Sequence, residues 1–258
     1  TLLAMSLGLM LGPAFAALFI DEKASALTWS LPFFIMAALF AVSAAILCFS
    51  MKEPTAAKSR KLSQIDWLGG LRDLRKLMDS GKSRRLIAIF CLNQVGAGAF
   101  FAAVPLVLES SGGFSPREIA AFLSAEGIFS GAVFAFFGPM LLKRTSLKNA
   151  LVIGLSASVA TIAVPLVSDN YFALWSITIL QAAGFGITYF TTLAIFSENA
   201  PDGKRGWVLS VLSSLWGLTM GGGLALCGVL AGISNATCVS ACLMLCAAAL
   251  FISRKTSV

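Results

Sequence analysis

The sequence contains no histidine, and only 12% of its 258 residues are charged. A soluble domain of this length would carry about 25% charged residues. Without histidine, the chain lacks the most common general base and the most common metal ligand in proteins. No cluster of Asp and Glu takes its place. We therefore predict that the chain is not an enzyme and that it holds no cofactor and no metal.

Apolar residues are abundant, because they make up 58% of the chain and give it a mean hydropathy of +0.88. They occur in blocks of about 20 residues, which is the length that crosses a bilayer. We therefore predict an all-α membrane protein with about eight transmembrane helices. The predicted spans are residues 2–20, 31–50, 86–108, 118–142, 149–168, 171–196, 207–230 and 234–253.

The cysteines all lie inside apolar stretches, at Cys48, Cys91, Cys227, Cys238, Cys242 and Cys246. The last three share one helical face because they are four residues apart. A site for a soft metal ion is one interpretation of this face, but no acidic residue lies near it in the sequence. We favour the other interpretation, in which these cysteines are small apolar packing residues.

Residues 51–85 form the only long polar segment and hold ten of the nineteen Lys and Arg residues. If this segment is cytoplasmic, helix alternation places seventeen of the nineteen on the same side and leaves only Lys23 and Arg117 outside. The acidic residues divide almost evenly, so the bias is the one that the positive-inside rule describes. We expect a cytoplasmic C-terminus in the inner (plasma) membrane of a bacterium. The basic pI of about 9.3 then reflects membrane topology, and we expect no nucleic acid partner.

The polar segment also carries an apolar residue at every third position, which predicts an amphipathic helix along the inner membrane face. Gly69 and Gly70 interrupt this pattern. The helix is either a tether with a solvated charged face or a regulatory site for anionic lipid, and we favour the tether. The recurring residues are Leu62, Ile65, Leu68, Leu71, Leu74 and Leu77.

Two short motifs resemble one family. The stretch GLMLGP contains Gly8, Gly12 and Pro13 and is followed by two alanines. It resembles the G-x-x-x-G-P-x-x-G-G signature in helix five of the major facilitator superfamily, which is typical of the drug:proton antiporter branch. The stretch GPMLLKRTSLKNAL resembles the second copy of the superfamily's G-x-L-x-D-R-x-G-R-R loop, although Leu142 replaces its Asp. The glycine and the basic residues that match this loop are Gly138, Lys143, Arg144 and Lys148.

The order of spans agrees with these motifs, because a major facilitator has two bundles of six helices joined by a long basic cytoplasmic loop. The resemblance implies a partial major-facilitator fold (2 + 6 of a 6 + 6 arrangement) that corresponds to helices five to twelve. Residues 1–50 would be the last two helices of the N-terminal bundle, 51–85 the linker, and 86–258 the C-terminal bundle. The chain begins inside an apolar run, so we expect it to be a fragment that lacks helices one to four.

The family implies a secondary active transporter of small molecules, with proton-coupled efflux by alternating access as the first interpretation. Its partners would be a small-molecule substrate, protons and the lipid bilayer, and the full-length protein would be monomeric. One alternative is a sugar or metabolite symporter of the same fold. The other alternative is a membrane protein that does not transport and acts as an assembly partner.

Glu126 is the only ionisable residue that falls well inside a predicted span. An acid at such a depth costs about 2.5–3.5 kcal/mol on insertion scales, so it usually faces a cavity or a partner. We therefore name Glu126 as a candidate proton carrier. The alternative is an acid near the outer water layer, or one that pairs with a polar neighbouring helix.

Polar and aromatic residues inside the spans are candidates for the wall of a substrate cavity. Gln181, Thr188 and Thr192 share one face of an ideal helix, with Tyr189 beside them. Hydrogen bonds between helices are the alternative role for the polar residues, and we favour packing for the threonines. For the aromatic residues, the alternative is plain core or lipid contact. The candidates are Asn93, Gln94, Gln181, Tyr189, Thr188, Phe101 and Trp216.

Overall fold

The computed structural model describes residues 2–18, 26–50, 75, 81–200 and 204–255. Every regular element in these ranges is a helix. Two helices precede the polar segment, namely α1 (Leu2–Ala17) and α2 (Ala26–Ser50). The helices that follow it are α4 (Gly81–Ser110), α5 (Pro116–Ala132), α6 (Gly138–Arg144), α7 (Leu147–Val167), α8 (Tyr171–Gln181), α9 (Ile187–Glu198), α10 (Arg205–Ala231) and α11 (Asn235–Arg254).

Two short π-helical segments join helices end to end. The segment η2 (Val133–Phe137) connects α5 to α6, and η3 (Ala182–Gly186) connects α8 to α9. The run from Pro116 to Arg144 and the run from Tyr171 to Glu198 are therefore each one continuous helical rod. With these joins, each of the eight predicted spans coincides with a helical rod.

The prediction of an all-α membrane protein is confirmed. In the described residues, seven helical rods are long and apolar enough to cross a bilayer, and a shorter apolar helix covers Leu7–Ala17. The predicted amphipathic helix and most of the basic linker lie outside the described residues. The end of that segment, from Gly81 to Arg85, forms the first turn of α4.

Short loops connect the rods, and polar side chains define where the helices begin. The Ser115 hydroxyl accepts a hydrogen bond from the backbone N–H of Glu118, and the Glu118 carboxylate accepts one from the backbone N–H of Ser115 at 2.8 Å. This reciprocal pair is a capping box, and Pro116 at the first helical position adds to it. The side chains of Asn170 and Ser234 cap α8 and α11 by accepting hydrogen bonds from backbone N–H groups of the first turn. Short loops make consecutive rods run antiparallel, but the most extensive packing joins rods that are not consecutive, such as α4 with α10 and with α11.

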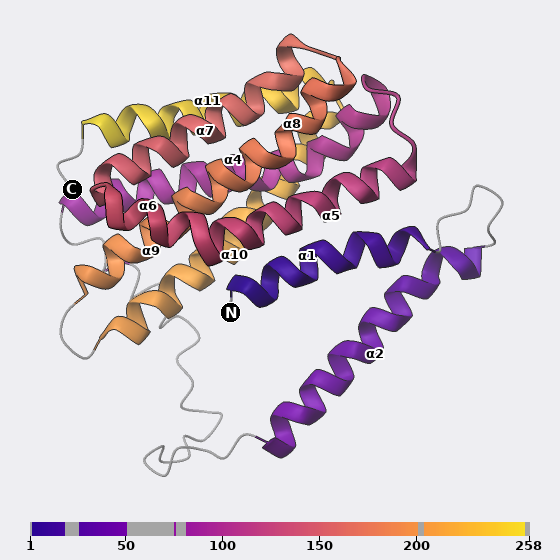
Figure 1. Cartoon of the computed structure of the whole chain (residues 1–258), viewed down its shortest axis with the longest axis horizontal. Helices are drawn as coiled ribbons and strands as arrows, with labels where there is room; N and C mark the ends of the chain where they lie inside the picture. Colours follow the sequence, from indigo (N-terminus) through magenta and orange to yellow (C-terminus); the bar gives the residue numbers. More distant parts are fainter. Residues whose placement is uncertain (1, 19–25, 51–74, 76–80, 201–203, 256–258) are drawn as a thin grey trace.

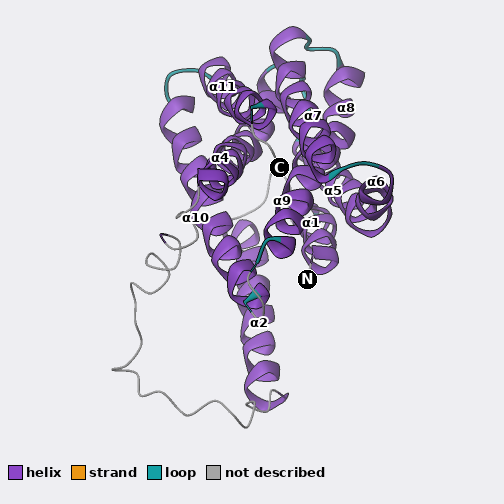
Figure 2. Cartoon of the chain, turned by 90° about the vertical axis from the view of Figure 1, so that its left-hand side faces the viewer, coloured by secondary structure: helices purple, strands orange, loops and turns teal. Residues whose placement is uncertain are grey.

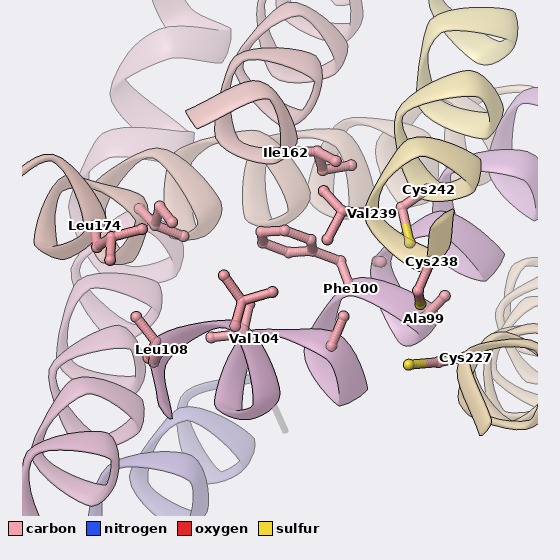
Figure 3. Close-up of a cluster of buried hydrophobic side chains, with 14 of the residues drawn as sticks. Ala99, Phe100, Val104, Leu108, Ile162, Leu174, Cys227, Cys238, Val239 and Cys242 are labelled. Atoms are coloured by element: carbon pink, nitrogen blue, oxygen red, sulfur yellow. The ribbon is translucent and has the colours of Figure 1, made fainter. Parts of the chain in front are cut away.

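The rods α4 to α11 pack into one bundle, α1 lies along α5, and α2 diverges from the rest (Figures 1 and 2). The largest core cluster of the bundle surrounds Phe100 of α4. Figure 3 shows Phe100 with Val104, Ile162 and Val239, while Cys238 and Cys242 lie at one side of the same cluster. Cys227 and Cys246 also belong to this apolar cluster, which agrees with the packing interpretation of the cysteines.

Glycines let several pairs of helices meet backbone to backbone. A Cβ on Gly98 of α4 would overlap the backbone of Met220 in α10, and a Cβ on Gly223 of α10 would overlap the carbonyl oxygen of Val95. A Cβ on Gly127 of α5 would likewise overlap the backbone of Met10 in α1. These positions therefore admit only glycine without a shift of one helix.

Candidate functional site

A cavity of about 540 Å³ lies between α1, α4, α5 with η2, α8 with η3 and α9, and α10. Its volume is in the range of sites that hold drug-sized ligands. Apolar and aromatic side chains form most of its wall, and a few polar groups converge on it. The lining residues are Leu9, Gln94, Ala97, Phe101, Glu126, Ser130, Phe134, Gln181, Phe185, Gly186, Tyr189, Trp216 and Met220.

Three buried polar side chains reach the cavity from three different rods. Gln94 comes from α4, Glu126 from α5 and Gln181 from α8, and each is at most 3% exposed. In the part of the chain that the structure describes, the Nε2 atom of Gln94, the Oε2 atom of Glu126 and both amide atoms of Gln181 have no hydrogen-bond partner. Buried polar atoms of native proteins nearly always have partners. These atoms are therefore free to bind a ligand, a proton or water in the cavity.

Two pairs of aromatic rings line the cavity. Phe101 of α4 and Phe185 of η3 lie 6.4 Å apart between ring centroids. Tyr189 of α9 and Trp216 of α10 lie 6.1 Å apart, and Phe90 of α4 also lies 6.1 Å from Tyr189. Such rings supply large apolar contact area and can accept a cation on their faces.

The π-helical segment η3 decides which residues of α9 face the cavity. In an ideal α-helix, Gln181 and Thr188 would share a face because they are seven residues apart. A π-helical turn accommodates one extra residue and rotates everything after it by about one position. Tyr189 therefore joins Gln181 on the cavity wall. Thr188 turns toward α7, where its side chain and backbone lie against Gly154.

The structure brings most of the predicted site residues together. Of the eight candidates named from the sequence, the six that line the one cavity are Gln94, Phe101, Glu126, Gln181, Tyr189 and Trp216. The other two, Asn93 and Thr188, are fully buried but lie outside the cavity wall. Asn93 faces α11, where its Oδ1 atom lies 3.9 Å from the Sγ atom of Cys246.

Sequence reasoning missed several lining residues, including Ser130 and Phe134. Ser130 of α5 and Phe134 of η2 follow Glu126 at intervals of four residues along one continuous rod, so all three face the cavity. That spacing was the available signal. Leu9, Phe185 and Met220 carried no comparable signal, because apolar residues in an apolar span do not reveal which way they face.

Charge is sparse around the cavity. Among the lining residues that the structure describes, Glu126 is the only acid, and none is Lys or Arg. The described cations of α4, α6 and α10 lie near the ends of those helices, at Lys82, Arg84, Arg85, Lys143, Arg144 and Arg205. Glu126 therefore faces the cavity without a basic side chain on the described part of its wall.

The two family-like motifs occupy different environments. A Cβ on Gly138 would lie 2.9 Å from the Val133 carbonyl oxygen and 3.3 Å from the ring of Phe190, so this glycine permits α6 to contact α9. Lys143 and Arg144 are exposed in the last turn of α6, where cations favour the helix dipole. Lys148 lies in the first turn of α7.

The motif in α1 packs less closely than its glycines suggest. A Cβ on Gly8 or Gly12 would meet no atom within 4 Å, and Pro13 lies inside the helix. The close approach between α1 and α5 instead uses Gly127 on α5.

Residues 2–224 of the chain match the family model described as Major Facilitator Superfamily. This match begins in α1 and extends into α10, so it includes every helix that lines the cavity. No curated protein matches the chain.

Proposed function

Because this chain belongs to the major facilitator superfamily, whose members are secondary transporters of small molecules, we propose that it exports its substrate in exchange for protons by alternating access. The observation that carries the proposal is the position of Glu126. Its carboxyl group is buried, faces the cavity and has an oxygen without a hydrogen-bond partner. A carboxyl group in this position can hold a proton in one state of the cavity and release it in another.

The chemistry of the wall favours a lipophilic substrate that is neutral or cationic. Aromatic rings from Phe101, Phe185, Tyr189 and Trp216 provide the apolar surface. The amides of Gln94 and Gln181 can donate and accept hydrogen bonds, and a cation could pair with Glu126. An anionic substrate would find no Lys or Arg on the described wall. Binding of a cation and binding of a proton at Glu126 would then compete, which is the basis of exchange.

The family-like motifs support the direction of transport and the membrane orientation. The stretch around Gly8, Gly12 and Pro13 resembles the signature of the drug:proton antiporter branch, which favours export. The distribution of Lys and Arg favours a cytoplasmic C-terminus in a bacterial inner membrane. We also propose that residues 1–50 and 86–258 belong to two different bundles of the transporter, joined through the basic linker 51–85.

The test is transport by the full-length protein in liposomes with an imposed pH gradient, using a panel of lipophilic cations. We expect Glu126→Gln to lower pH-driven exchange by on the order of 100-fold, because amides cannot carry the proton. Glu109→Gln is the matched control, since Glu109 is exposed at the end of α4. Unchanged transport and an unchanged pH profile in Glu126→Gln would remove Glu126 from the mechanism.

The same measurement separates export from symport. In an antiporter, an inward proton gradient drives substrate out, whereas in a symporter it drives substrate in. Accumulation of sugars or metabolites along the proton gradient would support the symporter of the same fold. Absence of counterflow across the whole panel would instead favour a membrane protein that does not transport.

A further inference from the structure

The residue after Glu126 is the point where α1 and α5 come closest. A Cβ on Gly127 would overlap the backbone nitrogen of Met10 and would lie 2.7 Å from its Cα atom. It would also lie 2.8 Å from the carbonyl carbon of Leu9. Because these neighbours are backbone atoms, a side chain at residue 127 has no flexible group to displace. Any residue larger than glycine must move α1 away from α5.

The same crossing forms one side of the cavity. Leu9 is the described residue of α1 that lines the cavity, and it lies next to Met10 at the crossing. The half-buried residues of α1 form a narrow stripe of Leu9, Met10, Pro13 and Ala16–Ala17, while Leu7, Leu11 and Phe15 are exposed. In the described part of the chain, α5 is the main packing partner of α1. The contact at Gly127 therefore sets how closely Leu9 covers the cavity beside Glu126.

We propose that Gly127 is a positioning residue for Glu126, because it admits the backbone of α1 closely enough for Leu9 to shield the carboxyl group from water. The proposal rests on the proposed function, since it assigns the transported proton to Glu126. A larger residue at 127 would separate the two helices and let water reach the carboxyl group. Water stabilises the charged form of a carboxyl group, so the variant would hold its proton less well.

Few other groups near Glu126 can titrate, so a change in its protonation can be assigned to this residue. The helices and π-helical segments packed against α5 are α1, α4, α8, η2 and η3. Their described charged residues lie in the first turns or the last turn of α4, and Tyr171 begins α8 beside the exposed Glu118. On the cavity wall, Tyr189 of α9 is the other group that can titrate. A changed pH response therefore comes from Glu126 or Tyr189, and labelling of the Glu126 carboxyl group itself separates the two.

Gly223 supplies a matched steric control. A Cβ there would overlap the carbonyl oxygen of Val95 and lie 2.7 Å from the nitrogen of Ala99, so the contact is again backbone to backbone. Neither Val95 nor Ala99 lines the cavity. Gly223→Ala therefore strains a helix contact of the same kind between α4 and α10, and not the crossing of α1 and α5. Gly217→Ala is the unstrained control, because a Cβ there meets no atom within 4 Å.

The experiment measures the labelling of Glu126 by a hydrophobic carbodiimide in the full-length protein, followed by mass spectrometry of the peptide. Carbodiimides react with the protonated carboxyl group, so labelling reports the proton directly and needs no transport. We expect Gly127→Ala to lower labelling at neutral pH by on the order of tenfold, which corresponds to about one pH unit. Gly223→Ala and Gly217→Ala should label like the unmodified protein.

A folded Gly127→Ala protein with unchanged labelling would overturn the proposal, and so would an equal loss of labelling in Gly223→Ala. If Gly127→Ala does not fold, Leu9→Ala opens the same wall without strain at the crossing. Leu9→Ala should also lower labelling, and unchanged labelling would contradict the shielding role. The proposed function fails separately, when Glu126→Gln transports with an unchanged pH profile.

Discussion

The pair α1–α2 and the bundle α4–α11 differ in how they hold their helices. In the apolar stretch of α4, 67% of the residues are buried, whereas no residue is buried in the corresponding stretch of α2. The bundle has clusters of buried apolar side chains and backbone contacts at Gly98 and Gly223. Helix α1 joins it mainly by packing along α5, where Gly127 lets the two backbones meet. Buried contacts between its own helices therefore stabilise the bundle, whereas α1 and α2 need lipid or other protein to cover their apolar faces.

The largest expected difference concerns phenylalanine side chains. Phe100 is fully buried in the core of the bundle, so Phe100→Ala should lower the free energy of unfolding by about 3–5 kcal/mol. Phe34 of α2 is 64% exposed, and Phe34→Ala should change it by less than about 0.5 kcal/mol. Thermal unfolding in detergent measures both. Equal losses would mean that α2 packs against protein as firmly as the bundle does.

A smaller difference is expected for glycines. Gly98→Val pushes α4 against the backbone of Met220, and overpacking of this kind costs about 1–3 kcal/mol. Gly8→Val adds a side chain where no atom lies within 4 Å, so we expect a change of less than about 0.5 kcal/mol. The midpoint of thermal unfolding again provides the measurement. A larger loss for Gly8→Val would show that the motif in α1 is covered by protein.

The smallest effect tests whether every buried residue of the bundle adds to its stability. The Oγ1 atom of Thr188 is buried without a hydrogen-bond partner, so Thr188→Val removes no hydrogen bond that this atom makes. We expect a change within about 0.5 kcal/mol of the unmodified protein, in either direction. Ligand binding, followed by quenching of Trp216 fluorescence against a Trp216→Phe control, should also be unchanged. A weakened affinity would mean that Thr188 lines the cavity.

Much of the fold could be predicted because the bilayer imposes it. The lengths of the apolar blocks predicted the rods, and the structure has a helix at each of them. The burial of Glu126 followed from the cost of placing an acid in an apolar span. These inferences need only local sequence, since each span satisfies its own backbone hydrogen bonds.

The sequence did not predict equally well which side chains point into the cavity and which point toward a neighbouring helix. Helical periodicity placed Thr188 with Gln181, but η3 rotates α9 so that Tyr189 takes that position. The residues AAGFG of η3 do not predict a π-helical turn, because they are also compatible with an α-helix. Asn93 and Gln94 are neighbours in the sequence, yet Asn93 faces α11 and Gln94 faces the cavity. Which neighbour turns inward depends on how α4 is rotated by the other helices.

The unpartnered amides of Gln94 and Gln181 have a consequence for ligand selection. Buried polar atoms require partners, and those of Gln94 and Gln181 find none in the described part of the chain. A hydrocarbon that entered the cavity would leave these atoms without hydrogen bonds. An amphiphile would supply the hydrogen bonds with its polar end while its apolar body lay against the aromatic rings. The two amides therefore favour amphiphiles over purely apolar molecules, including the acyl chains of the surrounding lipid.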